Sequence, residues 1–366
     1  MINKRRLINT FKKLVKIDSL SLQEGRIVKF LQKELKGMGL KAKLVGGVRD
    51  GEVGNLMVEM GGHGPRLLLN AHVDTVAPGE NIKPIERKGV IYSNGSTILG
   101  ADNKAGVAAI LEIIRSLKEN KIKHPPLQII FTVAEETGLL GAKALPEKRL
   151  KADFGIVMDG GDINAIIYKA PTQYNLTATI FGKAAHAGIH PEEGINAIQV
   201  ASIAIAKMRL GRIDKETTAN IGIIKGGRAT NIIPDEVEIK GEARSHNPAK
   251  LKTQIKHMEK LLSQTCKRFN ARLMLRVERM YKSFEMKKSS RIIQLAQSAM
   301  EAAKVKPVLK QTGGGSDANI FNERGINTII MGVGADRVHT TAERIAVSDF
   351  VKGTEILLNL IRRLTI

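Results

Sequence analysis

Cysteine is nearly absent from this chain, which has only Cys266 in 366 residues. One cysteine cannot form an intramolecular disulfide or supply a cysteine-rich metal site. The amino-terminal residues 1–18 mix charged and apolar side chains without an uninterrupted apolar core, so we expect no secretion signal there. Both features favour a reducing compartment, and we predict a cytoplasmic location.

Long apolar runs and aromatic residues are also scarce. No stretch offers the ~20 uncharged apolar residues that cross a bilayer, so we expect no membrane partner. Tryptophan is absent, while the formal net charge is +22. Such charge attracts nucleic acid, but stacking residues are few and the cations fall on several faces, as at Lys250, Lys252 and Lys256. We interpret them as a solvated basic surface with no specific nucleic-acid partner.

The sequence does contain many apolar strand patterns. Its length exceeds the comfortable size of one hydrophobic core, which predicts two domains. Apolar runs begin near residues 56, 66, 127 and 153, and a helical pattern covers Ala105–Lys118 between them. This rhythm predicts an α/β fold with a mainly parallel sheet and helices on both faces.

The pattern changes near Ala170. Strand, helix, strand, strand, helix and strand are then expected at residues 174–181, 195–210, 217–224, 235–243, 248–270 and 271–281. This βαββαβ order is that of a ferredoxin-like α+β unit. We predict a catalytic α/β domain built from residues 1–170 and 282–366, with residues 171–281 inserted as a lid domain.

Polar side chains follow the apolar run at residues 66–70. His72 and Asp74 come directly after it. In open α/β sheets, ligands bind beyond the carboxyl ends of the strands, and a metal-binding histidine is commonly oriented by a carboxylate. Taken alone, the same pair is typical of an ordinary strand-end turn.

Three further segments carry similar groups. Asp102 lies between glycines before a predicted helix, where aspartate is also a normal cap. Glu135 and Glu136 end another apolar run, and adjacent buried carboxylates repel each other unless a cation neutralises them. Asp159 precedes two glycines and His339 lies in a loop, and each of these alone is an ordinary surface residue.

Taken together, these groups predict a shared metal site. Random surface polarity seldom places histidines and carboxylates at the ends of four strands and the start of one helix. Imidazole and carboxylate ligands suit zinc, with cobalt or manganese as substitutes. Two ions ~3.5–4 Å apart commonly share a carboxylate and a water, which they activate for hydrolysis. An unligated carboxylate nearby would then be the general base.

The motifs that carry these residues resemble those of the dinuclear zinc exopeptidases and deacylases, a family that includes peptidase T, glutamate carboxypeptidase and aminoacylase. In chain order they are AHVDTV, GADNKAG, TVAEETG, VMDGG, GKAAHAG, GGRATNIIPDEVEIKGEARS, GGGSDAN and VHTTAE. The resemblance covers nearly the whole chain and is strongest to the peptidase T-like members.

The resemblance implies a role for each matching residue. Two zinc ions would have five ligands, namely His72 and Asp159 for one ion, Glu136 and His339 for the other, and Asp102 as the bridge. It also implies that Asp74 orients His72, that Glu135 is the general base, and that a cis peptide bond follows Asp102.

The predicted lid domain also carries matching residues. The resemblance implies that His186 stabilises the tetrahedral oxyanion and that Asn231 and Arg244 hold the terminal carboxylate of the substrate. It would place Gly313–Gly315, with Ser316 and Asp317, near the substrate. A homodimer through the lid domain is a further implication, and in some relatives the lid histidine serves the partner's site.

The resemblance therefore predicts a metallo-aminopeptidase that cleaves the amino-terminal bond of short peptides, with tripeptides as the expected substrates. The same ligands would also serve a carboxypeptidase or deacylase acting on dipeptides or N-acyl amino acids, so this alternative stays open. A catalytically silent binding protein is a remote third interpretation, because such a protein would not need Glu135.

Overall fold

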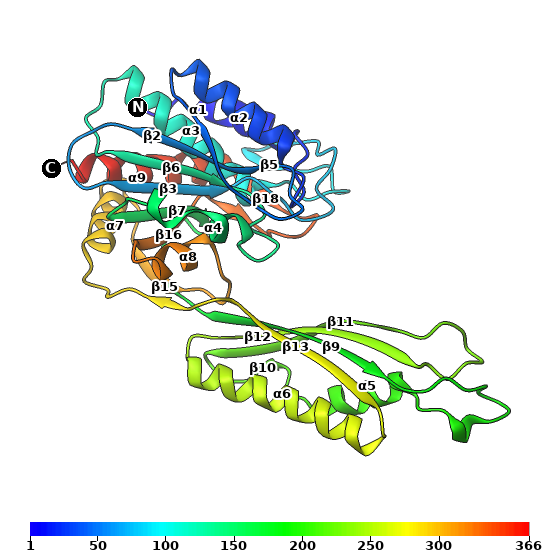
Figure 1. Cartoon of the computed structure of the whole chain (residues 1–366). Helices are drawn as coiled ribbons and strands as arrows, with labels where there is room; N and C mark the ends of the chain where they lie inside the picture. The colour runs from blue at the N-terminus through cyan, green and yellow to red at the C-terminus, as the bar shows by residue number, and fades with distance from the viewer. Residues whose placement is uncertain (366) are drawn as a thin grey trace. The chain divides into compact units, whose positions relative to one another are not determined.

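The chain divides into two compact units in the computed structural model, which describes residues 1–365 (Figure 1). Unit 1 contains Met1–Lys169, Glu285–Thr312 and the chain from Ser316 onward, and unit 2 contains Ala170–Phe284 with Gly313–Gly315. The ends of the inserted unit differ by a few residues from the predicted domain boundaries. The catalytic and lid roles of the two units stay predictions.

Unit 1 is built around one large sheet. Its strands are β1 (Lys43–Gly47), β2 (Gly54–Met60), β3 (Leu67–His72), β6 (Leu127–Thr132), β7 (Phe154–Gly160), β8 (Ala165–Ala170), β14 (Phe284–Glu285), β15 (Val308–Gln311) and β16 (Asn327–Gly332). Their order is β1-β2-β6-β3-β7-β16-β8-β14, with β15 paired to β8. The central strands β6, β3, β7 and β16 are parallel, and antiparallel strands extend both sides. The mainly parallel sheet is confirmed.

Helices cover both faces of this sheet, which explains why its central strands are continuous apolar runs rather than alternating patterns. All residues of β3 and β6 are buried. On one face lie α1 (Lys4–Val15), α3 (Ala101–Glu119), α7 (Arg291–Ala302) and α9 (Val347–Arg363), and on the other lie α4 (Leu140–Ala144) and α8 (Asp317–Glu323) (Figure 1). Helix α2 (Gly25–Gly37) follows α1 along the chain.

A smaller sheet in unit 1 positions a loop of functional interest. Its strands are β4 (Ile85–Arg87), β5 (Val90–Tyr92), β17 (Ala335–Asp336) and β18 (Arg344–Ala346), in the order β17-β18-β5-β4. Because β17 and β18 pair in antiparallel fashion, the chain between them forms a loop held at both ends. His339 lies in this loop.

Helix α3 begins earlier than the predicted Ala105–Lys118. It starts at Ala101, but Asp102 and Asn103 have non-helical backbone angles, so the regular part of the helix begins after them. The peptide bond between Asp102 and Asn103 is cis, as the resemblance implies. Nearly every residue of α3 is buried because α1 and α9 pack outside it.

Unit 2 has the predicted βαββαβ order. Its elements are β9 (Thr172–Phe181), α5 (Ala197–Ala206), β10 (Gly211–Arg212), β11 (Thr217–Gly226), β12 (Glu236–Ser245), α6 (Pro248–Arg268) and β13 (Arg272–Tyr281). The sheet order β10-β11-β12-β9-β13 is antiparallel throughout. The two helices share one core with the sheet, which includes Leu176, Val200, Ile239 and Met258. The ferredoxin-like α+β architecture is therefore confirmed.

Gly313–Gly315 belong to unit 2 rather than to the α/β domain in which the prediction placed them. The reason is a close approach to β13. A Cβ atom on Gly315 would lie 2.1 Å from Cζ of Tyr281, so only glycine fits at this position.

Among residues 1–365, no helix combines the length and the apolar character needed to cross a membrane.

Candidate metal and catalytic centre

The five residues predicted as metal ligands converge in unit 1. Their elements explain this, because the carboxyl ends of neighbouring parallel strands meet at one edge of a sheet. His72 ends β3, Asp159 lies near the end of β7, Glu136 follows β6, Asp102 lies in the first turn of α3, and His339 lies between β17 and β18.

These residues form two groups that share Asp102. His72, Asp102 and Asp159 form one group and Asp102, Glu136 and His339 the other, and within each group the potential ligand atoms lie within 4.8 Å of one another. The residue pairing equals the one that the resemblance implies. Whether each residue binds a metal ion stays a prediction.

The two carboxylate oxygens of Asp102 face different histidines. Oδ1 lies 3.0 Å from Nε2 of His72, and Oδ2 lies 3.4 Å from Nε2 of His339. His72 Nε2 is also 3.5 Å from Oδ1 of Asp159, and His339 Nε2 is 2.9 Å from Oε1 of Glu136. Asp102 therefore occupies the position that a carboxylate bridging two cations would need.

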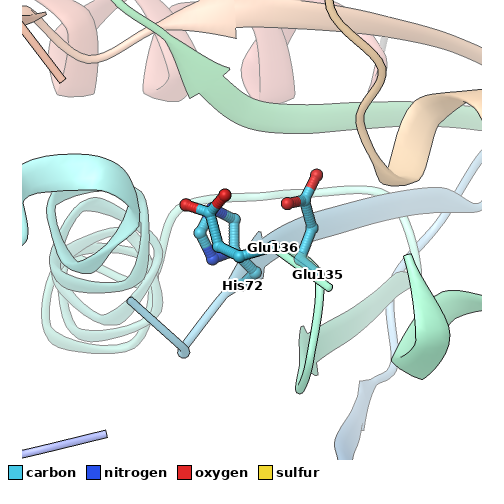
Figure 2. Close-up of side chains that lie close together, drawn as sticks. All are labelled: His72, Glu135 and Glu136. Carbon is cyan, nitrogen blue, oxygen red and sulfur yellow. The ribbon is translucent and has the colours of Figure 1, made fainter. Parts of the chain in front are cut away.

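Glu135 lies beside the two groups that share Asp102 but is a member of neither. It forms a third close group with His72 and Glu136. Figure 2 shows Glu135 and Glu136 side by side, with the carboxylate of Glu136 at the imidazole of His72 and that of Glu135 to one side. Glu135 is thus free for a role other than that of its neighbour.

Asp74 contacts the imidazole of His72 through both its main chain and its side chain, and its role in orienting His72 stays a prediction. Nδ1 of His72 lies 3.0 Å from the main-chain oxygen of Asp74 and 3.4 Å from its carboxylate Oδ1. A carbonyl oxygen only accepts hydrogen bonds, so Nδ1 carries a proton, and Nε2 is the ring nitrogen that faces Asp102 and Asp159. The Asp74 carboxylate also accepts hydrogen bonds from Ser21 Oγ and from the main-chain N–H groups of Glu135 and Glu136.

Glu343 was not predicted as a site residue, although it lies in the same VHTTAE motif as His339. Its buried carboxylate accepts hydrogen bonds of 2.7–2.9 Å from the main-chain N–H groups of Leu99, Gly100 and Asp102. It thereby joins the loop that carries His339 to the segment that carries Asp102. The spacing of four residues from His339 was the available signal, but it could not reveal these distant partners.

Lys104, in the GADNKAG motif, was also missed. Its side chain is fully buried, and Nζ donates a hydrogen bond of 2.7 Å to the main-chain oxygen of Ile17. Burial lowers the pKa of Lys104 to about 7. The residue anchors the start of α3 to the chain that follows α1.

The centre concentrates negative charge in a buried place. Burial raises the pKa of Glu135 well above its ordinary value, and burial together with the nearby charge of Asp102 raises the pKa of Asp159 to about 7. Burial also acts on Asp102, but its hydrogen bonds with His339 and His72 hold its pKa below the usual range. These carboxylates are incompletely neutralised by the protein itself.

The two histidines respond to the same charges. Burial alone lowers the pKa of His72, but its carboxylate partners, of which Asp102 is the strongest, raise it well above the ordinary value. Hydrogen bonds with Asp102 and Glu136 raise the pKa of His339 to about 10. Protons on these imidazoles occupy the place that a metal cation would take, and the donor set fits a divalent transition metal.

A cavity of about 250 Å³ opens beside the ligands. It is lined by Asp102 and Asp159, by Asp336 at the end of β17, and by Arg337 and Val338 of the β17–β18 loop. A small molecule could therefore approach both carboxylates from within unit 1.

The predicted substrate residues lie in unit 2, where the structure separates them. His186 and Asn231 are exposed neighbours, since Ala187 N–H donates to the main-chain oxygen of Asn231. Arg244 lies in β12 opposite Gln173 of β9. Its guanidinium donates two hydrogen bonds, of 2.8 and 2.9 Å, to the carboxylate of Glu242.

A mainly parallel α/β sheet whose carboxyl edge carries two imidazole–carboxylate groups joined by a shared aspartate defines the class of metal-dependent hydrolases. The sequence model of peptidase family M20/M25/M40 matches residues 68–363. The chain belongs to this family and is a peptidase.

Two solved structures are similar over the whole chain. A tripeptidase from Staphylococcus aureus is 41% identical with a TM-score of 0.93, covering 100% of this chain and 99% of that one. The aminopeptidase PepT from Bacillus cereus is 41% identical with a TM-score of 0.87, covering 100% of both chains. The uncharacterized protein YqjE of Bacillus subtilis is 40% identical over 99% of each chain. The chain is therefore a peptidase T-like member of the family.

The raised pKa of Asp159 predicts a pH effect on the stability of the metal-free protein. Between pH ~4 and pH 7 the folded state holds a proton that the unfolded state has released, so the free energy of unfolding falls as pH rises, by up to about 1.4 kcal/mol per pH unit. Asp159→Asn should reduce this slope. Urea unfolding of the chelator-treated protein at several pH values measures it.

Asp162→Asn is the control for this experiment, because Asp162 pairs with Lys310 outside the ligand groups and its pKa is lowered. It should leave the downward slope in place. An unchanged slope in Asp159→Asn would contradict the assignment of the effect to the centre.

Proposed function

We propose that this peptidase is a metallo-aminopeptidase that removes the amino-terminal residue of short peptides, chiefly tripeptides, with two zinc ions. The observation that carries the proposal is the position of Asp102 between two histidines, with Glu135 outside the pair of groups that share it. The similarity to a tripeptidase and to an aminopeptidase, each at 41% identity, supports the substrate class.

The proposed ligands are those that the resemblance implies: His72 and Asp159 for one ion, Glu136 and His339 for the other, and Asp102 for both. When bound, such a pair of ions lowers the pKa of a water molecule and polarises the scissile carbonyl. Cobalt or manganese would fit the same donor set.

Glu135 performs the proton transfer in this proposal. Its carboxylate accepts a proton from the water that attacks the amide carbon and returns it to the amine nitrogen as the C–N bond breaks. A general base works best when its pKa lies near the operating pH, and the burial that raises the pKa of Glu135 is consistent with this requirement.

The first test is a substrate panel for the zinc- or cobalt-loaded protein. Tripeptides should be hydrolysed with the highest kcat/KM, and the released amino acid should be the amino-terminal one, as measured by chromatography of the products. Dipeptides, acetylated and succinylated amino acids complete the panel. If only the acylated amino acids were hydrolysed, the protein would be a deacylase and the proposed aminopeptidase activity would be wrong.

The roles of neighbouring residues predict different variant phenotypes. Glu135→Ala should lower kcat by ~10²–10⁴-fold, which is the rate enhancement that a general base usually contributes. Its zinc content should stay at two ions per chain. Asp102→Ala should lose zinc, because both groups share this residue. Metal analysis and steady-state kinetics on the same preparations measure both effects, and near-normal kcat in Glu135→Ala would exclude it as the base.

The distance between Arg244 and His186 within unit 2 limits how one substrate molecule can contact both residues. Arg244 is paired with Gln173, and the β9–β12 pairing continues from there to Phe181, a span of about 26 Å at ~3.3 Å per residue. The ribbon extends further, since Ile233 N–H donates to Ala185 and Ala187 N–H donates to Asn231. An extended tripeptide spans only ~10 Å, so it cannot touch Arg244 and His186 of one subunit.

We therefore include a homodimer in the proposal, with His186 and Asn231 supplied by the partner chain. An edge of the unit 2 sheet supports this. In the described chain, β10 pairs only with Thr218 and Ala219 of β11, which leaves the outer edge of β11 beyond them without a strand partner. The side chains of Ile223 and Ile224 are 42% and 48% exposed there. A second copy could pair with this edge about a twofold axis.

Mixed dimers test this arrangement. His186→Ala and Arg244→Ala should each abolish most activity alone, whereas co-expression of both chains should restore about a quarter of wild-type activity, because half of randomly paired dimers are mixed and each has one intact site of two. Kinetics on the co-purified dimer measure the recovery. If both residues act in one chain, mixing restores nothing.

A further inference from the structure

The main-chain N–H groups of the turn that carries Glu135 and Glu136 donate hydrogen bonds to side chains from distant segments. Four consecutive main-chain N–H groups, those of residues 133–136, donate to Asn55 Oδ1, Glu24 Oε1, Asp74 Oδ1 and Asp74 Oδ2 at 2.9–3.1 Å. Ala134, at the centre of this turn, has a φ of +50°, in the left-handed region that side chains other than glycine rarely adopt. These outside acceptors therefore stabilise the conformation, together with local main-chain hydrogen bonds to the carbonyl oxygens of Ala134 and Glu135.

Glu24 is the acceptor for Ala134. Its side chain is fully buried, and Oε1 accepts hydrogen bonds from Leu22 N–H at 2.8 Å and from Ala134 N–H at 2.9 Å. Glu24 is also the residue that precedes helix α2, yet its carboxylate makes no capping hydrogen bond to that helix. Helix capping, the ordinary role of such a residue, thus does not explain why this carboxylate is buried.

The rest of the Ser19–Glu24 segment contacts the other ligand-bearing turn, which follows β3. Ser21 Oγ donates to Asp74 Oδ2 at 2.7 Å. Ser19 Oγ donates to the main-chain oxygen of Val73, and Thr75 N–H donates to the main-chain oxygen of Ser19. We call the Ser19–Glu24 segment the amino-terminal clasp, because it joins the turn after His72 to the turn that carries Glu135.

The clasp lies outside residues 68–363, the stretch that the family model matches. Its contacts nevertheless reach the two turns on which the ligand groups depend. The centre is thus completed by a part of the chain that carries none of the ligands.

We propose that Glu24 and Ser21 are positioning residues of the active site, which fix the Glu135–Glu136 turn through Ala134 N–H and the carboxylate of Asp74. The proposal rests on the function of Glu135 given above. Glu24 sets the backbone of the turn directly, and Ser21 holds Asp74, which in turn holds both glutamates. Because small displacements of a catalytic group can cost ~10²-fold in rate, loss of Glu24 acts on kcat more than on KM.

The chemistry of Glu24 provides a sharp test. Oε1 accepts both hydrogen bonds, whereas Oε2 is buried without a hydrogen-bond partner in the described chain. Glu24→Gln keeps the accepting oxygen and should retain kcat within about threefold, whereas Glu24→Ala should lower kcat by ~10- to 100-fold. Ser21→Ala removes one of three hydrogen bonds to Asp74 and should have a smaller effect.

Glu112→Ala is the matched control. Glu112 is also a fully buried glutamate with several hydrogen bonds, but its partners are Arg6 and Asn3 near α1. This variant should lower thermal stability and leave kcat unchanged. It separates a general loss of stability from a local effect on the turn.

A second measurement does not depend on activity. In the metal-free protein, amide hydrogen exchange of a peptide covering residues 133–139 should be faster in Glu24→Ala than in wild type, nearly unchanged in Glu24→Gln, and unchanged in Glu112→Ala. Kinetics should use whichever panel substrate the wild-type enzyme turns over best, with metal content measured in each variant.

The outcomes separate the two proposals. If the wild-type enzyme hydrolysed no panel substrate, the proposed function would be refuted. The hydrogen-exchange measurement would still test the structural role of the clasp, because it needs no activity. If the wild type were active and Glu24→Ala kept full kcat and unchanged hydrogen exchange, the proposed positioning role of Glu24 would be wrong. Equal damage from Glu24→Gln and Glu24→Ala would overturn it as well, because the accepting oxygen is present in the first.

Discussion

Buried negative charge at the carboxyl edge of the sheet is the constraint on which the rest of this structure depends. Asp102, Glu135, Glu136 and Asp159 crowd around His72 and His339, and burial raises the pKa of Glu135 and Asp159. Such a group of carboxylates is costly to desolvate unless cations neutralise it. In the proposed function, two divalent metal ions would offset this cost, and Glu135 would remain available for proton transfer.

The turns at this edge are held by carboxylates that bind main-chain N–H groups. Asp74 binds the turn of Glu135 and Glu136, Glu343 binds the segment of Asp102, and Glu24 binds Ala134. Each anion satisfies donors that a strand or helix would otherwise pair. The ligand positions are thus fixed by hydrogen bonds from distant segments, in addition to the strands themselves.

Much of the fold was predictable because it follows local patterns. The continuous apolar runs of β3 and β6 and the helical periodicity after Asp102 are local patterns that need no tertiary information. The βαββαβ order of unit 2 follows in the same way. The missed features are long-range. Gly315 joins unit 2 because it packs on Tyr281, and no local pattern contains that contact.

The sequence alone determined the chemical inventory of the centre, since residue types at strand ends and ordered motifs depend only on local chain properties. The tertiary structure decided which oxygen of Asp102 faces which histidine and which ring nitrogen of His72 faces Asp102. It also decided that Glu24 reaches Ala134 across 110 positions. Strand register likewise set His186 and Arg244 apart. Distances of this kind arise from the packing of segments remote in sequence, which periodicity and motif spacing do not encode.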